Sequence, residues 1–187
     1  MTREADRPLP RTSGEREGVR RTILVLCLGN PLRRDDAMAL HVADALERLA
    51  LPGLEVRRSA RAGLYLLDDM EGFDRVVVVD AIRTQGGVPG TIHSLPLEAI
   101  HSPGGPSPHA IGLPSAIAAA RAAGAPVPTH LHVVAMEVLE LDEIGEGLTP
   151  AVARAIPGAV GAVRAAVELM WPPPPALSPG GGEGKNP

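Results

Sequence analysis

The chain has 187 residues, of which 44% are hydrophobic, and a formal net charge of -4. This length predicts one domain, because a domain of about 150 residues already buries roughly 68–70% of the surface of its unfolded chain. The acidic balance excludes a global basic field that would hold polyphosphate or an anionic membrane. Aromatic residues make up only 2% of the chain, which argues against a stacking surface for single-stranded nucleic acid. We therefore expect no nucleic-acid partner and no membrane partner.

Composition divides the chain into a folded middle and two ends. Residues 1–20 are charged, contain Pro and Gly and lack apolar periodicity, which predicts a disordered N-terminal arm. Residues 172–187 are so rich in Pro and Gly that no helix or strand can continue through them, which predicts a disordered tail. A single α/β domain is expected over residues 21–171.

The cysteine count and the lengths of the apolar runs indicate in which cellular compartment the protein is expected. The single cysteine, Cys27, excludes an internal disulfide and a Cys-rich metal site, and it is compatible with a reducing cytosol. Cys27 lies inside an apolar strand pattern, where a thiol is expected to act as a small hydrophobe and not as a nucleophile. No apolar run approaches the ~20 residues needed to cross a bilayer. We expect a cytoplasmic protein.

Apolar runs alternate with helical patterns along the domain. Runs rich in β-branched residues predict strands over 22–28, 54–58, 75–80 and 130–135, with a weaker strand over 91–96. This alternation is the order expected of a βαβ sheet. Because aromatic residues are few, the core has to be built from Leu, Val, Ile and Ala, which suits a parallel or mixed sheet covered by Ala-rich helices.

Two helices have clear signals. After the first strand, apolar residues recur at helical spacing, namely Ala39, Val42, Ala43, Leu46 and Leu49. His41 falls on the opposite side of this helix and is expected to face solvent. The last helix is predicted to begin at Thr149-Pro150, because Thr is favoured at the N-cap and Pro at the first helical position. Its predicted apolar stripe is Ile156, Val160, Val163, Val167 and Met170.

Two adjacent carboxylates, Asp35 and Asp36, follow the first strand and its Gly29-Asn30-Pro31 turn. One carboxylate at the start of a helix is explained as a cap for free backbone N–H groups and a complement to the helix dipole. A second adjacent charge gains little and adds repulsion. Asp36 is therefore a candidate functional residue.

Two further candidates lie later in the chain. Asp80 ends the run Val76-Val77-Val78-Val79, and the carboxyl ends of such buried strands face the functional crevice of open α/β sheets. The alternative for Asp80 is an N-cap or turn residue. His109 ends a Gly/Pro-rich loop that begins near Ser102, and long loops of this kind are functional or disordered. By itself, a lone loop histidine is more often structural than functional.

Asp36, Asp80 and His109 together offer nitrogen and oxygen donors with open positions. Such a set suits a divalent transition metal, such as nickel or zinc, that is held weakly and shared with another molecule. The sequence contains no H-E-x-x-H, G-x-S-x-G or G-x-x-x-x-G-K motif. Zincin, serine-hydrolase and P-loop chemistry therefore lose support.

Four landmarks occur in a fixed order, namely Gly29-Asn30 with Asp35-Asp36, Asp80-Ala81, Pro108-His109 and Gly147-Leu148-Thr149-Pro150. With these landmarks, residues 22–170 resemble the hydrogenase maturation endopeptidases. The resemblance implies a single α/β domain in three layers, with a twisted, mostly parallel (mixed) sheet of about five strands between helices. It places Asp36, Asp80 and His109 at the nickel-contacting positions of that family.

The activity implied by the resemblance is removal of a C-terminal extension from the large-subunit precursor of a [NiFe] hydrogenase after nickel insertion. The nickel would belong to the precursor, whose thiolates supply most of its coordination, and the protease, expected to be a monomer, would complete it. Either Asp36 or Asp80 would serve as general base, and the sequence does not choose between them.

The chain departs from the family pattern at three places. Arg61 lies where the family has a Gly-rich turn, Pro114 lies inside the helix that follows the histidine, and Met136-Glu137 stands where a small residue and a proline are common. These departures keep two alternatives open: a non-catalytic nickel-binding or docking module with the same fold, and another hydrolase that shares the fold.

Overall fold

The computed structural model describes residues 22–99 and 113–171. The strands are β1 (Ile23–Leu28), β2 (Leu54–Ser59), β3 (Arg75–Ile82), β4 (Ile92–Pro96) and β5 (His130–Glu137). The helices are α1 (Met38–Leu49), α2 (Leu66–Met70), α3 (Leu113–Ala122) and α4 (Pro150–Met170), with short 3₁₀ helices η1 (Asp35–Ala37), η2 (Gly63–Tyr65) and η3 (Leu97–Ala99). All five predicted strands are confirmed.

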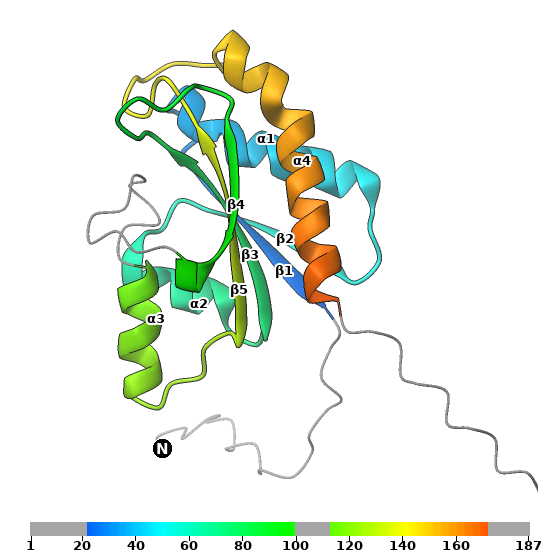
Figure 1. The fold of residues 1–187 in the computed structure, drawn as a ribbon, viewed down its shortest axis with the longest axis vertical. Helices are drawn as coiled ribbons and strands as arrows, with labels where there is room; N and C mark the ends of the chain where they lie inside the picture. The colour runs from blue at the N-terminus through cyan, green and yellow to red at the C-terminus, as the bar shows by residue number, and fades with distance from the viewer. Residues whose placement is uncertain (1–21, 100–112, 172–187) are drawn as a thin grey trace, which may run out of the picture.

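The strands form one sheet in the order β2-β1-β3-β5-β4. β1 pairs in parallel with β2 and β3, and β3 pairs in parallel with β5. β4 pairs with β5 in the antiparallel direction and closes one edge. The predicted mostly parallel, mixed sheet is confirmed, and its parallel strands all run toward the same end of the molecule (Figure 1).

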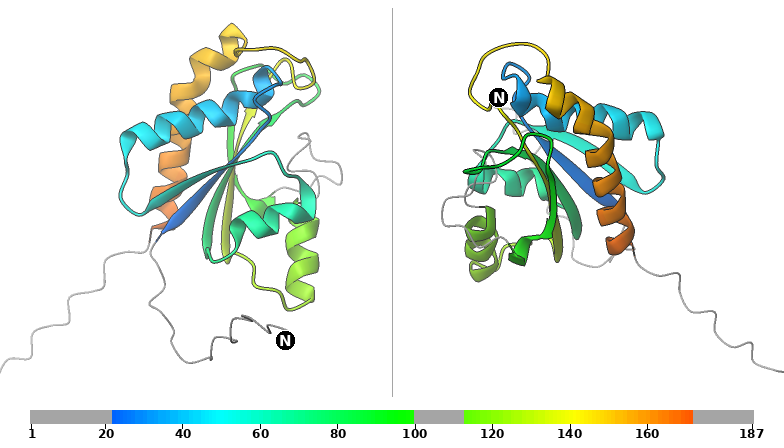
Figure 2. Two further views of the ribbon diagram at one scale, coloured as in Figure 1. Left: turned by 180° about the vertical axis from the view of Figure 1, so that it is seen from behind. Right: turned by 45° about the horizontal axis from the view of Figure 1, so that its top comes forward.

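Side-chain alternation along the central strands builds two apolar layers. Odd-numbered residues of β1, such as Val25 and Cys27, pack with α1 and α4, whereas Leu24 and Leu26 pack with α2 and α3. Figure 2 shows the two pairs of helices on opposite faces of the sheet. The central strands are buried on both faces because each face is covered by helices, which explains their unbroken apolar sequences.

Helix α1 confirms most of the predicted apolar stripe. Its first four members, Ala39 to Leu46, are buried, and His41 is exposed as expected. The prediction that Leu49 belongs to the stripe is wrong, because Leu49 is the last residue of the helix and its side chain is exposed. Directly after it, Ala50 adopts a left-handed φ of 47° and ends the helix.

Helix α4 begins at Pro150 with Thr149 in the N-cap position, as predicted. Its predicted stripe lies against the core, with Val163 buried and the other four members partly buried. Helix α3 contains Pro114 in its first turn, where the missing backbone donor does no harm, so the helix starts at Leu113 and continues to Ala122.

The predicted arm (residues 1–20), the predicted tail (172–187) and the loop that carries His109 lie outside the described residues. Within residues 22–99 and 113–171, no helix has the length and apolar character required to cross a membrane.

Candidate active site

The carboxyl ends of β1, β3 and β5 lie at one edge of the sheet because these neighbouring strands are parallel. The loops that follow them, residues 29–34, 83–91 and 138–149, therefore gather at this edge, at the top of Figure 1. Functional crevices of open α/β sheets are formed at such edges. The two acidic candidates of the sequence, Asp36 and Asp80, both lie there.

Asp36 is held in η1 by the turn that follows β1. Its side chain is buried, and its Oδ2 accepts a hydrogen bond from the backbone N–H of Asn30 at 2.8 Å. Gly29 lies directly against the backbone of Asp36, and a Cβ at Gly29 would overlap the Asp36 carbonyl oxygen. The Gly29-Asn30 pair is thus required for two reasons: glycine permits the close approach of η1, and the next N–H orients the carboxylate.

Asp80 lies near the carboxyl end of β3 and is completely buried. By strand alternation its side chain shares a sheet face with Val78 and Ile82, which pack toward α2 and α3. Its Oδ1 accepts a hydrogen bond from the backbone N–H of Ala81 at 2.9 Å. Because β3 continues to Ile82, Asp80 is a residue within the strand, and the alternative of an N-cap before a helix is wrong.

The structure brings the elements that carry the two carboxylates together, since η1 contacts β3. His109, the third predicted ligand, lies outside the described residues, so the complete set of three is a prediction that the structure does not test. Among the residues that are described, no group of three or more His, Cys, Asp or Glu side chains is arranged to hold a metal ion. Two oxygen donors alone leave most of a metal's coordination to other ligands.

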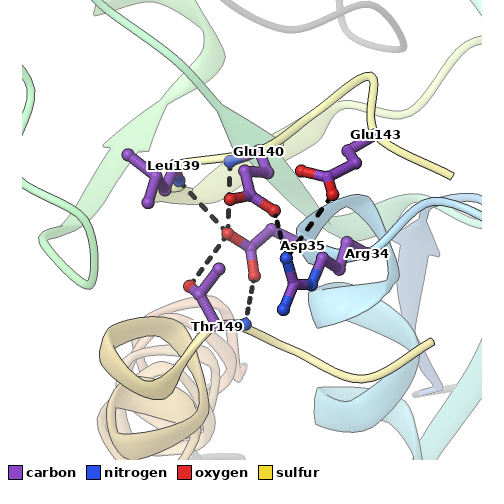
Figure 3. Close-up of polar contacts among 6 residues, drawn as sticks. All are labelled: Arg34, Asp35, Leu139, Glu140, Glu143 and Thr149. Atoms are coloured by element: carbon purple, nitrogen blue, oxygen red, sulfur yellow. Dashed lines mark hydrogen bonds and ion pairs between the residues drawn. The ribbon is translucent and has the colours of Figure 1, made fainter. Parts of the chain in front are cut away.

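Asp35 has a role that differs from the predicted helix cap. Its carboxylate accepts hydrogen bonds from the N–H groups of Leu139 and Glu140, each at 3.2 Å, and from the N–H and hydroxyl of Thr149 at 2.7 and 3.0 Å. No side-chain cap hydrogen bond is made at the start of η1 or α1. Figure 3 shows Asp35 between the loop after β5 and the start of α4. The carboxylate satisfies backbone donors of distant segments, which local sequence spacing cannot reveal.

Arg34 forms a second link between the same segments. Its Nη1 lies 2.8 Å from Glu140 Oε2 and 3.7 Å from Glu143 Oε1 (Figure 3). A side-chain hydrogen bond with Glu140, together with the charge of Glu140, raises the pKa of Glu143, while Arg34 acts in the opposite direction. The loops after β1 and β5 are thus joined by both the buried Asp35 and a more exposed ion-pair cluster.

Glu137 is a buried carboxylate to which the sequence assigned no role. Its Oε2 accepts a hydrogen bond from the backbone N–H of Thr84 at 3.0 Å, and its Oε1 accepts one from the Thr84 hydroxyl at 2.5 Å. The Nε2 of His93 lies 3.5 Å from the same Oε1. Gly87 packs so closely on this carboxylate that a Cβ would overlap it. The departure from the family pattern at this position therefore anchors the loop between β3 and β4.

The structure also shows the surroundings of Arg61 and Cys27, two other residues discussed from the sequence. Arg61 follows β2, and its guanidinium lies 3.2 Å from Asp69 and 3.5 Å from Asp68. Cys27 is buried in β1, and burial raises the pKa of its thiol to about 12. Its burial in the core confirms the prediction of a small hydrophobic residue, and a thiol with a raised pKa is a poor nucleophile at neutral pH.

The fold and this edge define an α/β protein with buried carboxylates at the carboxyl ends of neighbouring parallel strands. The family model described as HycI, hydrogenase maturation protease, matches residues 40–166. The chain belongs to the hydrogenase maturation protease family.

Individual relatives agree with this assignment. The chain is 36% identical over 149 residues to the hydrogenase 2 maturation protease of Escherichia coli K12, a match that covers 78% of this chain and 90% of that one. A hydrogenase expression/formation protein HupD of Rhodobacter capsulatus is 31% identical over 143 residues, covering 74% of this chain and 67% of that one. Among solved structures, the hydrogenase maturating endopeptidase HybD of E. coli aligns with a TM-score of 0.64 and 32% identity, over 79% of this chain and 93% of that chain.

Proposed function

We propose that this protein is an endopeptidase that removes the C-terminal extension of a [NiFe] hydrogenase large-subunit precursor after nickel has been inserted. Family membership supports a protease of hydrogenase maturation. The observation that carries the finer proposal is the position of Asp36 and Asp80, two buried carboxylates on contacting elements at the carboxyl edge of the sheet. In this proposal they contact the nickel of the substrate together with His109.

An incomplete donor set fits a metal that arrives with the substrate. Nickel that is already bound by thiolates of the precursor needs few further ligands, and an imidazole, which suits nickel, can supply them together with two carboxylates. The protease then binds a loaded precursor more tightly than an empty one, because only the loaded form offers the metal. Discrimination of this kind requires no resident metal in the protease.

The same carboxylates are the candidates for acid–base catalysis. A divalent metal near the scissile bond polarises a carbonyl or lowers the pKa of a bound water. Either Asp36 or Asp80 then takes the proton of the attacking water as general base. The Asn30 N–H orients the first carboxylate and the Ala81 N–H the second, so both are preorganised. The proposed compartment is the cytoplasm.

Incubation with nickel-loaded and nickel-free precursor, followed by mass spectrometry, tests the proposal. Trimming of the loaded form alone is expected. Equal trimming of both forms would disprove recognition by way of nickel. Binding of loaded precursor without any change in mass would instead favour the alternative, a non-catalytic nickel-binding or docking module.

Isosteric variants test the two carboxylates. Asp36→Asn and Asp80→Asn are each expected to lower the trimming rate by about 10²-fold or more. Asp74→Asn is a matched control, because Asp74 is an exposed aspartate next to the opposite end of β3. Thermal unfolding of all three variants reports whether the fold is intact. A fully active Asp80→Asn variant would contradict the assigned role.

A further inference from the structure

Three large apolar side chains are exposed on the two loops that are joined at the carboxyl edge of the sheet. Leu32 lies in the loop after β1 and is 69% exposed, whereas Leu139 and Ile144 lie in the loop after β5 and are 56% and 84% exposed. Scattered single apolar residues are normal on a protein surface. Here three occur on adjoining loops beside the candidate active site, and we name these residues the apolar rim.

The two loops form one ordered surface. Arg33 pairs with Ile144 in an isolated antiparallel bridge, and the Gly145 N–H donates to the Leu32 carbonyl at 3.2 Å. The backbone of Asp35 donates to the Glu140 carbonyl at 3.2 Å. In Figure 2 the segment between β5 and α4 passes beside the segment that leads into α1. The apolar rim is therefore held in place before any partner binds, which reduces the entropic cost of docking.

Most charges near the apolar rim are paired with one another. Arg34 binds Glu140 and Glu143, and Asp142 lies 3.7 Å from Arg33 and 3.2 Å from Arg83. These ion pairs occupy the arginine and carboxylate groups that would otherwise attract a charged partner. Glu146 of the same loop is exposed and has no ion pair among the described residues, so this surface offers a partner one carboxylate beside the three apolar side chains.

We propose that the apolar rim is the docking surface for apolar side chains on the folded precursor, next to the segment that is cleaved. This inference rests on the proposed function: η1 carries Asp36 directly after the loop that holds Leu32, so a substrate that reaches Asp36 also meets the apolar rim. Docking on the rim contributes to substrate binding and not to bond cleavage.

Polar substitutions test the rim. The double variant Leu32→Ser/Ile144→Ser is expected to raise KM for the loaded precursor about tenfold or more, because it removes two of the three apolar side chains that contact the precursor in this proposal. Its kcat should stay within about twofold of the wild-type value, because neither residue touches the reacting atoms. Leu169→Ser is the matched control, since Leu169 is 81% exposed on α4 and does not belong to the loops at the catalytic edge. Thermal unfolding of each variant checks the fold.

Several outcomes would overturn the proposal. An unchanged KM in the double variant removes the rim from docking, while trimming by the wild-type protein leaves the proposed function standing. A KM that changes strongly between about 0.1 and about 1 M salt shows docking led by charge. Sedimentation of the protein alone checks for self-association, and a dimer that the double variant dissociates assigns the rim to a second copy.

Failure of the proposed function can be distinguished from failure of the docking proposal. If the wild-type protein binds the loaded precursor without trimming it, the proposed activity is wrong. The apolar rim is then tested by the Kd of the complex with the loaded precursor. A Kd that rises about tenfold in the double variant supports docking on the rim, and an unchanged Kd overturns it. If the wild-type protein does not bind the loaded precursor at all, both proposals fail.

Discussion

Thr149 donates two hydrogen bonds to Asp35, although the two residues are 114 positions apart in the chain. The backbone N–H lies 2.7 Å from Oδ1 and the hydroxyl lies 3.0 Å from Oδ2. This contact fixes the start of α4 against η1. Because η1 also carries Asp36, the arrangement ties the position of a candidate catalytic residue to a helix from the far end of the domain.

Removal of this carboxylate should destabilise the fold strongly. Asp35→Ala leaves the N–H groups of Leu139, Glu140 and Thr149 without their acceptor. The Thr149 contact is buried and the other two are partly buried, and a buried donor left unsatisfied costs about 1–3 kcal/mol. We expect a total loss of at least about 3 kcal/mol in the free energy of unfolding, measured by urea denaturation. Thr149→Val, which removes one hydroxyl, should cost only about 1 kcal/mol. Equal losses in the two variants would contradict the assigned role of Asp35.

The close approach of Gly29 to η1 predicts that even a methyl group is harmful there. In Gly29→Ala the new Cβ overlaps the carbonyl oxygen of Asp36, which is backbone and cannot rotate away. Such overpacking typically costs about 1–3 kcal/mol, and it should also lower trimming activity by moving Asp36. Gly161→Ala is the control, because Gly161 lies within α4 with open space around it, and alanine there should stabilise the protein by about 0.5–1 kcal/mol. Calorimetry distinguishes the two effects by sign.

The thiol of Cys27 should be inert in the folded protein. Burial raises its pKa to about 12, so at pH 8 the thiolate fraction in the folded state is far below that of an exposed cysteine. Iodoacetamide at this pH is expected to leave the native protein unmodified and to alkylate one site after unfolding in guanidinium chloride. Rapid alkylation of the native protein would show that the β1 thiol is accessible.

The buried Glu137 predicts a local effect on the loop between β3 and β4. In Glu137→Gln an amide group replaces one of the two carboxylate oxygens that accept from Thr84, so one donor loses its acceptor at a cost of about 1–3 kcal/mol. Hydrogen exchange of the Thr84 amide should accelerate, whereas amides in the centre of β1 should be protected as before. Thr84 exchange that does not differ from the wild-type rate would show that this carboxylate does not hold the loop.

The strands and the main helices could be predicted because their signals are local. Val76 to Val79 form an apolar run that only a covered strand can bury, and Thr149-Pro150 is a start signal read from two adjacent residues. The prediction failed at Leu49, where periodicity extended the apolar stripe by one residue although the helix ends there. Met136-Glu137 departs from the family pattern in the sequence, but the sequence does not show the partners of Glu137, since Thr84 and Gly87 lie in the loop between β3 and β4.

The candidate site also has a part that could be predicted from the sequence and a part that could not. Asp36 and Asp80 could be proposed from the sequence because each follows or ends an apolar strand, and parallel strands place such positions at a common edge. Only the tertiary structure assigned the adjacent carboxylates to different tasks, with Asp35 bound to Leu139, Glu140 and Thr149 and Asp36 bound to Asn30.

The sequence by itself thus determined the class of fold, the family and the edge of the sheet at which the candidate site is expected. These follow from periodicity and from motifs within a few residues of one another. The tertiary structure decided which carboxylate is structural, what Glu137 holds and which loops form the apolar rim. Each of these depends on hydrogen bonds or packing between segments that are distant in the chain, and such contacts leave no periodic trace in the sequence.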